Sequence, residues 1–219
     1  MRKDIITSAI GIVVLTVLLG IIYPLFITGV SQVAFPGNAN GQKVYVDGRL
    51  VGSKIIGQNF ADIVYKNGKP EMSDGNPVTT PDPHYFQTRP SGTDPADNDA
   101  ATEFANYGPN SVVTKAALVA NIQAYIALNG KYYPGGLTAA KIPVDAADTS
   151  ASGVDPEISI ANADIQAYRI AAIRHLSLAT VDGLISKYTL GRGLWFSGEP
   201  GVDVLEINLA LNRLSPSTR

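Results

Sequence analysis

The chain of 219 residues contains no cysteine. Without cysteine there can be no disulfide, no thiolate nucleophile and no cysteine-ligated zinc or iron–sulfur site. A domain built from this chain must therefore be stabilised by its own apolar core or by contacts with partner subunits.

Charge is also scarce in this sequence. Charged residues make up 16% of the chain and the net charge is −2. Proteins that bind nucleic acid usually concentrate positive charge to meet the phosphate backbone, so the composition argues against a nucleic-acid partner. A Gly-x-x-x-x-Gly-Lys-Ser/Thr loop, which would cradle nucleotide phosphates, is absent as well.

One segment carries no charge at all. Arg2 and Lys3 precede an uncharged run from Ile5 to Val30, long enough as a helix to cross a hydrocarbon core of roughly 30 Å. A cleaved signal peptide is the alternative, but its apolar part is typically about 7–15 residues and ends in a small-residue cleavage site. No such site follows Phe26, so we predict an uncleaved transmembrane anchor at residues 1–30, with Pro24 interrupting the helix near its far end.

The charges beside this run predict its orientation. Lys and Arg are retained on the cytoplasmic side of a membrane helix, and the next basic residue after Lys3 is Lys43. We therefore expect a cytoplasmic N-terminus at the cell membrane, a linker at residues 31–41, and a single extracytoplasmic domain at residues 42–219.

Local patterns predict an α+β fold for that domain, with a small sheet early and helices late. Asp47-Gly48 favours a type I′ hairpin, Asn67-Gly68 is a second hairpin signal weakened by Pro70, and residues 72–108 are expected to be mostly loop. Apolar stripes at helical spacing predict four helices. The first is capped by Asn110 or Ser111 and stops in a left-handed turn at Asn129-Gly130, the second is capped by Ser159, the third covers residues 178–188, and the last runs from Asp203 to about Leu214.

No set of side chains describes a complete enzyme. His84 and His175 show no positioned partner, which a general base requires. Ser152 lacks the leading glycine of a nucleophile elbow, so the hydroxyls of Ser150 and Ser152 are expected to stabilise a turn. Three arginines, Arg89, Arg169 and Arg174, could bind an anion, although an arginine placed like Arg89, before Pro90, more often pins a loop. The acidic loop formed by Asp145, Asp148, Asp155 and Glu157 lacks the ligand spacing of a calcium site.

Several segments together resemble one family, the C subunit (KdpC) of the Kdp-type potassium-transporting ATPase. The resemblance covers nearly the whole chain, and the segments occur in the family's order. They are Tyr23-Pro24, Gly52-Ser53-x-Ile55-Ile56-Gly57-Gln58-x-Phe60, Tyr85-Phe86-x-x-Arg89-Pro90-Ser91, Asn106-Tyr107-Gly108-Pro109, Ser150-Ala151-Ser152-Gly153-Val154-Asp155-Pro156-x-Ile158-Ser159, Gly198-Glu199-Pro200 and Val204-Leu205-x-Ile207-Asn208-Leu209-Ala210-Leu211. The family usually has Arg and Asn where Gly201 and Asp203 stand.

The resemblance implies a non-catalytic subunit of an ATP-driven potassium import complex. Its partners would be a channel-like potassium-translocating subunit, a P-type ATPase subunit and a small membrane peptide, with ATP and potassium handled by the complex and no cofactor or metal bound by this chain alone. The family member is needed for assembly and is described as a catalytic chaperone that raises the ATP affinity of the ATPase subunit. The candidate partner or motif residues are Gly57, Phe60, Tyr85, Phe86, Arg89, Pro90, Ser150, Ser152, Gly153, Asp155, Glu199, Pro200 and Asn208.

Gln58 is the residue to which the nucleotide role would carry over, but its predicted location conflicts with that role. An extracytoplasmic Gln58 cannot touch cytoplasmic ATP, so any coupling must be indirect, and we expect the domain to cap the outer mouth of the potassium-translocating subunit. Two alternatives remain open at this point: a membrane-tethered extracytoplasmic hydrolase that uses Ser150 or Ser152 with a histidine, and a solute-binding module.

Overall fold

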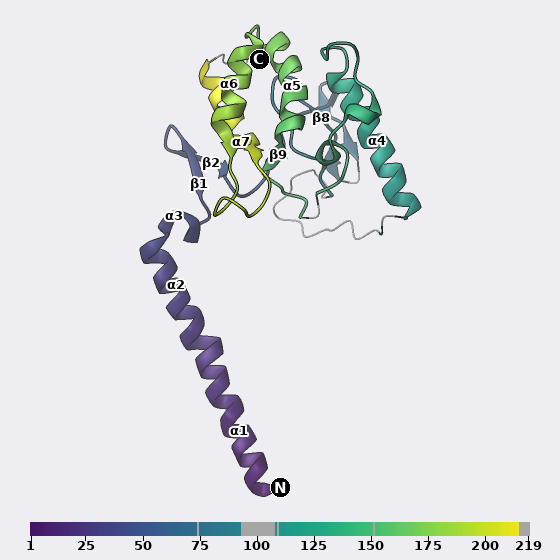
Figure 1. Ribbon diagram of the computed structural model, residues 1–219. Coiled ribbons are helices and arrows are strands. Elements are labelled where there is room, and N and C mark those ends of the chain that lie inside the picture. Colours follow the sequence, from purple (N-terminus) through teal and green to yellow (C-terminus); the bar gives the residue numbers. More distant parts are fainter. Residues whose placement is uncertain (74, 93–107, 109, 151, 215–219) are drawn as a thin grey trace. The chain divides into compact units, whose positions relative to one another are not determined.

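The computed structural model describes residues 1–219 with the exception of 74, 93–107, 109, 151 and 215–219. The chain divides into two units, residues 1–53 and residues 54–219. Helices and strands are both present (Figure 1), which confirms the mixed class that the sequence predicts. Asn106, Tyr107, Pro109 and Ala151 of the family motifs, and the domain end beyond Leu214, lie outside the described residues.

The first unit begins with an apolar helix of 33 residues, Arg2–Ala34. It comprises α1 (Arg2–Val17), a wider π-helical stretch (Leu18–Ile22) and α2 (Tyr23–Ala34). None of the residues in this helix is buried against the rest of the structure. At 1.5 Å per residue the helix is about 50 Å long, so by length and composition it could cross a membrane.

The interruption expected at Pro24 is the π-helical stretch that immediately precedes α2. Proline has no N–H to donate, and its ring displaces the carbonyl four residues earlier, which a widened turn accommodates. The helix then continues to Ala34, beyond the predicted end at Val30, and α3 (Pro36–Ala39) follows. Much of the segment expected to be a linker, residues 31–41, is therefore helical, because nothing opposes the helix before Phe35, which precedes a proline.

A β-hairpin completes the first unit. Strands β1 (Lys43–Val46) and β2 (Arg49–Ser53) pair in antiparallel register. Asp47 and Gly48 have φ angles of 49° and 77°, as a type I′ turn requires. The hairpin predicted from Asp47-Gly48 is confirmed.

The second unit contains a three-stranded antiparallel sheet in the order β10-β11-β9. Its strands are β9 (Glu157–Ser159), β10 (Thr189–Leu190) and β11 (Gly201–Asp203). Three short antiparallel pairs precede it: β3 (Ala61–Ile63) with β8 (Thr79–Pro81), β4 (Tyr65–Lys66) with β5 (Lys69–Pro70), and β6 (Met72–Ser73) with β7 (Asn76–Pro77). The expectation of loop after Met72 is thus wrong for β6, β7 and β8, which are too short to show an alternating pattern.

Four helices follow the predicted pattern: α4 (Val112–Asn129), α5 (Ile160–Ile173), α6 (Leu178–Tyr188) and α7 (Val204–Leu214). The hydroxyls of Ser111, Ser159 and Ser177 accept hydrogen bonds from first-turn amides of α4, α5 and α6. The predicted left-handed stop after α4 is wrong: Gly130 has a φ of −60° and donates to the Ile126 carbonyl, so α4 ends in a right-handed turn.

The core of the second unit lies among α5, α6, α7 and the three-stranded sheet (Figure 1). It is built from small and aliphatic side chains, together with one aromatic ring from the segment before α4: Phe86, Ile158, Ala163, Ala167, Ile170, Val181, Ile185, Val202, Val204, Ile207 and Leu211. Helix α4 contributes little to it, since Asn129 is its only buried residue, although α4 is itself 18 residues long and apolar enough to span a membrane by composition.

Candidate functional site

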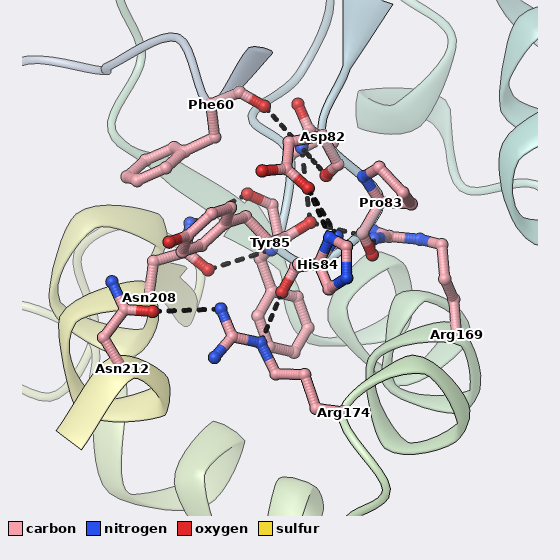
Figure 2. Close-up of polar contacts among 11 residues, drawn as sticks. Phe60, Asp82, Pro83, His84, Tyr85, Arg169, Arg174, Asn208 and Asn212 are labelled. Carbon is pink, nitrogen blue, oxygen red and sulfur yellow. Dashed lines mark hydrogen bonds and ion pairs between the residues drawn. The ribbon is translucent and has the colours of Figure 1, made fainter. Parts of the chain in front are cut away.

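The Tyr-Phe-x-x-Arg-Pro-Ser motif lies in an irregular segment, residues 82–91, that begins with a turn at Pro83-His84 and is held by side chains of α5 and α7 (Figure 2). Phe86 is fully buried, and so is Asn208 of α7. The Phe86 N–H donates to Asn208 Oδ1 at 2.9 Å, and Asn208 Nδ2 donates to the Phe86 carbonyl at 2.9 Å. A single amide side chain thus replaces the neighbouring strand that this stretch of backbone lacks.

A second amide side chain binds the next residue in the same way. The Gln87 N–H donates to Gln166 Oε1 at 2.8 Å, and Gln166 Nε2 donates to the Gln87 carbonyl at 3.1 Å. Gln166 is a buried residue of α5. Asn208 and Gln166 therefore satisfy the backbone of two consecutive residues from opposite helices, and this pair is called the amide clamp below.

Arg169 of α5 is fully buried beside the clamp. Its guanidinium donates to four neutral oxygens: the carbonyls of Pro83 and Tyr85, Asn129 Oδ1 and Gln166 Oε1. Burial lowers the pKa of Arg169 to about 10, so the side chain remains charged at neutral pH. A buried charge is tolerated only where its donors are satisfied, and here those donors fix the path of the segment.

Arg174, the residue that ends α5, holds the same segment from its other side. Its Nε donates to the His84 carbonyl at 2.6 Å and its Nη2 to Asn212 Oδ1 at 3.0 Å. The guanidinium lies 4.8 Å from the centre of the Tyr85 ring, a cation–π distance. Desolvation lowers the pKa of Arg174, and both arginines are used to pin a loop.

The Gly-Gln-x-Phe motif lies next to this segment. Phe60 accepts hydrogen bonds through its carbonyl from the Asp82 N–H at 3.0 Å and from Gln87 Nε2 at 2.9 Å, and its ring is 5.4 Å from that of Tyr85. Asp82 is buried, and its Oδ1 accepts two hydrogen bonds from His84. The first comes from the His84 backbone N–H at 2.9 Å and the second from Nδ1 of the His84 ring at 2.8 Å.

The serine-rich motif joins the other end of the segment. Arg89 Nη1 donates to Asp155 Oδ2 at 2.9 Å, and Ser152 Oγ donates to Asp155 Oδ1 at 2.7 Å. The Ser150 N–H donates to the Pro90 carbonyl at 2.7 Å, and Ser150 Oγ accepts from the Gly153 N–H at 3.0 Å. Ser91 Oγ donates to the Gly153 carbonyl at 2.6 Å, so the two motifs are joined by several hydrogen bonds.

Gly57 shows how closely the motifs approach each other. Its N–H donates to the Val154 carbonyl at 2.7 Å. A Cβ placed on Gly57 would lie 2.5 Å from the Asp155 carbonyl oxygen, well inside van der Waals contact. Glycine is required at this position by proximity to another backbone.

Two hollows border the segment. One of about 200 Å³ is lined by exposed Gln58 together with Asp82, Tyr85 and Asn212. The other, of about 300 Å³, lies between Arg89 and the α4 residues Asn121, Ala124 and Tyr125. Burial raises the pKa of Tyr125, and its hydroxyl donates to Asn162 Oδ1 at 2.7 Å.

The Gly-Glu-Pro motif is placed elsewhere. Glu199 is exposed and pairs with Arg192 at 2.7 Å, and Pro200 leads directly into β11. These two residues are therefore apart from the network that joins the other candidate residues.

The serine and histidine side chains that a hydrolase would need lie in turns or at a helix end. Ser152 bonds to Asp155 and Ser150, whereas His84 bonds to Asp82 and His175 occupies a left-handed position, with a φ of 55°, just after α5. In the part of the chain that the structure describes, no group of three or more His, Cys, Asp or Glu side chains is placed to hold a metal ion.

Sequence reasoning missed Gln166 and Asp82, and it placed Arg169 and Arg174 only as possible anion ligands. A signal for Gln166 and Arg169 was present, because they fall within the apolar stripe of α5 formed by Ala163, Ala167 and Ile170. A polar residue inside such a stripe is buried, and a buried polar group must find a hydrogen-bond partner.

Comparison with known proteins agrees with the motif pattern. The family model described as "KdpC: K+-transporting ATPase, c chain" matches residues 5–213. A protein of Methylococcus capsulatus is 39% identical over 93% of this chain and 94% of its own length, and one of Methylibium petroleiphilum is 41% identical over 92% and 93%. A protein of Mycobacterium bovis is 37% identical over 98% and 100%. Each of these relatives is named "Potassium-transporting ATPase KdpC subunit".

Proposed function

This chain belongs to the KdpC family, the c chains of K+-transporting ATPases, and from that premise we propose that it is a non-catalytic, single-pass accessory subunit of a potassium import complex. The helix Arg2–Ala34 anchors it in the cell membrane, and the second unit lies outside the cytoplasm. Its partners are the channel-like potassium-translocating subunit, whose outer mouth it caps, the P-type ATPase subunit and a small membrane peptide.

The observation that carries this proposal is that the motif residues hold neighbouring parts of the domain in place. Phe60, Phe86, Arg89, Ser150 and Asn208 bond or pack within one connected network. Side chains that already hold neighbouring backbone in place are not free to take a substrate's proton or to attack a bond. The motifs thus support a rigid domain that presents a surface to partners.

The charges at the anchor support the proposed orientation. Arg2 and Lys3 begin the helix, whereas its far end, up to Ala34, has no basic residue. Retention of Lys and Arg on the cytoplasmic side leaves the second unit on the outer side. Any nucleotide effect of this chain then passes indirectly, through the helix and the partner subunits, to the ATPase subunit.

The surroundings of Gln58 also support an indirect effect. The hollow beside Gln58 measures about 200 Å³ and includes Asp82, an acidic residue. Ligand pockets usually measure about 300–1,000 Å³, and a carboxylate repels the phosphates of ATP. Direct ATP binding at Gln58 is therefore not part of the proposal.

Labelling from one side of the membrane tests the topology. Gln58 is exposed and the chain has no cysteine, so a Gln58→Cys variant carries one reactive thiol. We expect a membrane-impermeant maleimide to label it in intact cells, and a Lys3→Cys variant to be labelled only after lysis. The reverse pattern would place the second unit in the cytoplasm and overturn the proposed orientation.

Assembly and nucleotide affinity are tested on the complex. We expect the full chain to copurify with the pump subunits, and complexes containing it to reach half-maximal ATPase activity at lower ATP than complexes lacking it. A pump that is complete and equally active without this chain would contradict the accessory role. Replacing Gln58 by alanine, with the domain folded, is expected to leave the ATP dependence unchanged.

A further inference from the structure

The loop between β10 and β11 carries three consecutive large apolar residues near its middle, and their side chains are exposed to solvent. Leu194, Trp195 and Phe196 are 75%, 93% and 75% exposed. Leaving such side chains out of a core forgoes the stabilisation that their burial would give. Single exposed apolar residues are common, whereas contiguous ones often mark an interaction site. We call these three residues the apolar tip.

The backbone of the tip is paired within the loop itself. Gly193 and Ser197 exchange two hydrogen bonds of 2.8 Å, the Phe196 N–H donates to the Gly193 carbonyl, and the Trp195 N–H donates to the Arg192 carbonyl. Arg192 and Glu199 pair at 2.7 Å at the base. The N–H groups of Gly193, Trp195, Phe196 and Ser197 are thus paired within the loop, which lowers the cost of placing this backbone in a layer of low polarity.

The tip is also held in an unusual backbone conformation. Leu194 and Trp195 have φ angles of 49° and 68°, in the left-handed region that is unfavourable for a residue with a Cβ. Such a conformation in bulky residues commonly marks a functional site. Here it projects the side chains outward, where they add nothing to the core of their own unit.

We propose that the apolar tip inserts into the headgroup interface of the bilayer in which helix Arg2–Ala34 is anchored. Tryptophan is enriched at membrane–water interfaces because its ring is apolar and its N–H can still reach a polar partner. Arg192 and Glu199 at the base offset each other's charge, so the base of the tip carries no net charge. The domain would then contact the bilayer twice, through its helix and through the tip.

The size of the tip favours lipid over a protein partner. Three side chains of this kind bury about 150–250 Å² each at most, and the tip is a narrow turn with charged residues at its base. A standard protein interface buries about 800 Å² on each partner, so the tip alone falls short of one. Insertion into lipid needs no complementary surface.

The single tryptophan makes the proposal directly measurable. Trp195 is the only tryptophan of the chain, so the emission of the full chain in phosphatidylcholine vesicles reports on the tip. We expect vesicles with brominated acyl chains near the headgroup to quench the emission roughly twofold or more relative to unbrominated vesicles, as for an interfacial ring.

A variant with its tryptophan elsewhere in the same unit is the control. Trp195→Phe combined with Leu214→Trp moves the probe to the end of α7, where Leu214 is 55% exposed. Helix α7 has 11 residues and is about 16 Å long, which separates the probe from the tip. Strong quenching of Trp195 and weak quenching in this variant would support insertion of the tip.

This proposal rests on the proposed function, in which residues 2–34 anchor the chain in the membrane. Vesicle flotation distinguishes a failure of the anchor from a failure of tip insertion. A chain that does not float with vesicles contradicts the anchor. A chain that floats but shows no quenching of Trp195, or equal quenching in the control variant, overturns insertion of the tip. Emission that shifts to the blue only when the pump subunits are added would also overturn it, in favour of a protein interface.

Discussion

Asp203, the last residue of β11, is a buried carboxylate in an acidic environment. It is fully buried, and its Oδ2 has no hydrogen-bond partner among the described residues. Its Oδ1 accepts from the Glu206 N–H at 2.8 Å, and Glu157 is directly opposite on β9. We predict that Asp203→Asn stabilises the protein.

The pKa of Asp203 gives the size of the stabilisation expected from this substitution. Burial, opposed by the hydrogen bond from Glu206 and reinforced by the charges of Glu206 and Glu157, raises this pKa from 3.8 to about 6. A pKa difference of this size corresponds to about 3 kcal/mol. Because the folded state holds its proton more tightly than the unfolded state, stability is lost as the pH rises from about 4 to 6, and the loss is complete at pH 7.

Asparagine has nearly the shape of a protonated aspartic acid and keeps the oxygen that accepts from Glu206. We therefore expect Asp203→Asn to gain up to about 3 kcal/mol at pH 7.5, a rise in melting temperature of roughly 6–12 °C for a chain of this size. As the pH falls toward and below 4, Asp203 becomes protonated in the unfolded state as well, so the stabilities of the variant and the natural chain should converge.

Thermal unfolding of the full chain in detergent, followed by circular dichroism between pH 4 and pH 8, measures this difference. Burial also raises the pKa of Glu157, and the part of its pH dependence that does not arise from the charge of Asp203 is present in both proteins and cancels. Exposed Asp182 on α6 supplies the control, since Asp182→Asn is expected to differ from the natural chain only by the relief of its repulsion with Asp164. A variant that melts in parallel with the natural chain at every pH, or below it at pH 7.5, would refute the account.

Three further changes test the network around residues 82–91 by thermal unfolding. Asn208→Ala leaves two buried backbone groups of Phe86 unpaired and should cost about 2–4 kcal/mol; an unchanged melting temperature would show that water replaces the amide. Gly57→Ala places a Cβ 2.5 Å from a carbonyl oxygen and should lower the free energy of unfolding by about 1–3 kcal/mol. Gly183→Ala is the control: it lies in open space within α6 and should raise the free energy of unfolding by about 1 kcal/mol. Equal effects of the two substitutions would contradict the close approach at Gly57. Arg89→Lys keeps the charge but loses the fork that reaches Asp155 and the Asp148 carbonyl, and should cost about 1–2 kcal/mol; a lysine that melts like arginine would show that only charge matters.

Features that depend on neighbouring residues could be predicted well. The hairpin turn at Asp47-Gly48 and the caps at Ser111 and Ser159 follow from the side chains and φ angles of a few consecutive residues. The end of α4 could not be predicted in the same way. Asn129 is drawn into the interior by its bond from Arg169, 40 residues away, and this contact displaces the left-handed stop that Asn-Gly favours locally.

The short strands and the amide clamp were beyond local patterns for the same reason. Strands of two or three residues, such as β6 and β10, are too brief to alternate visibly. The clamp joins Phe86 to Asn208, separated by 122 residues, and Gln87 to Gln166, separated by 79. Pairing over such distances leaves no periodic trace in either segment.

The sequence by itself determined that this chain has a long uncharged helix, a mixed fold, no thiol chemistry and the motifs of the KdpC family, because composition, turn residues, caps and motif order are all local properties. Only the tertiary structure decided what the motifs do. It showed that one irregular segment, residues 82–91, is held by four side chains: those of Arg169, Arg174, Asn208 and Gln166. Buried backbone groups require hydrogen-bond partners, and here the partners come from residues that are brought together only when the chain folds.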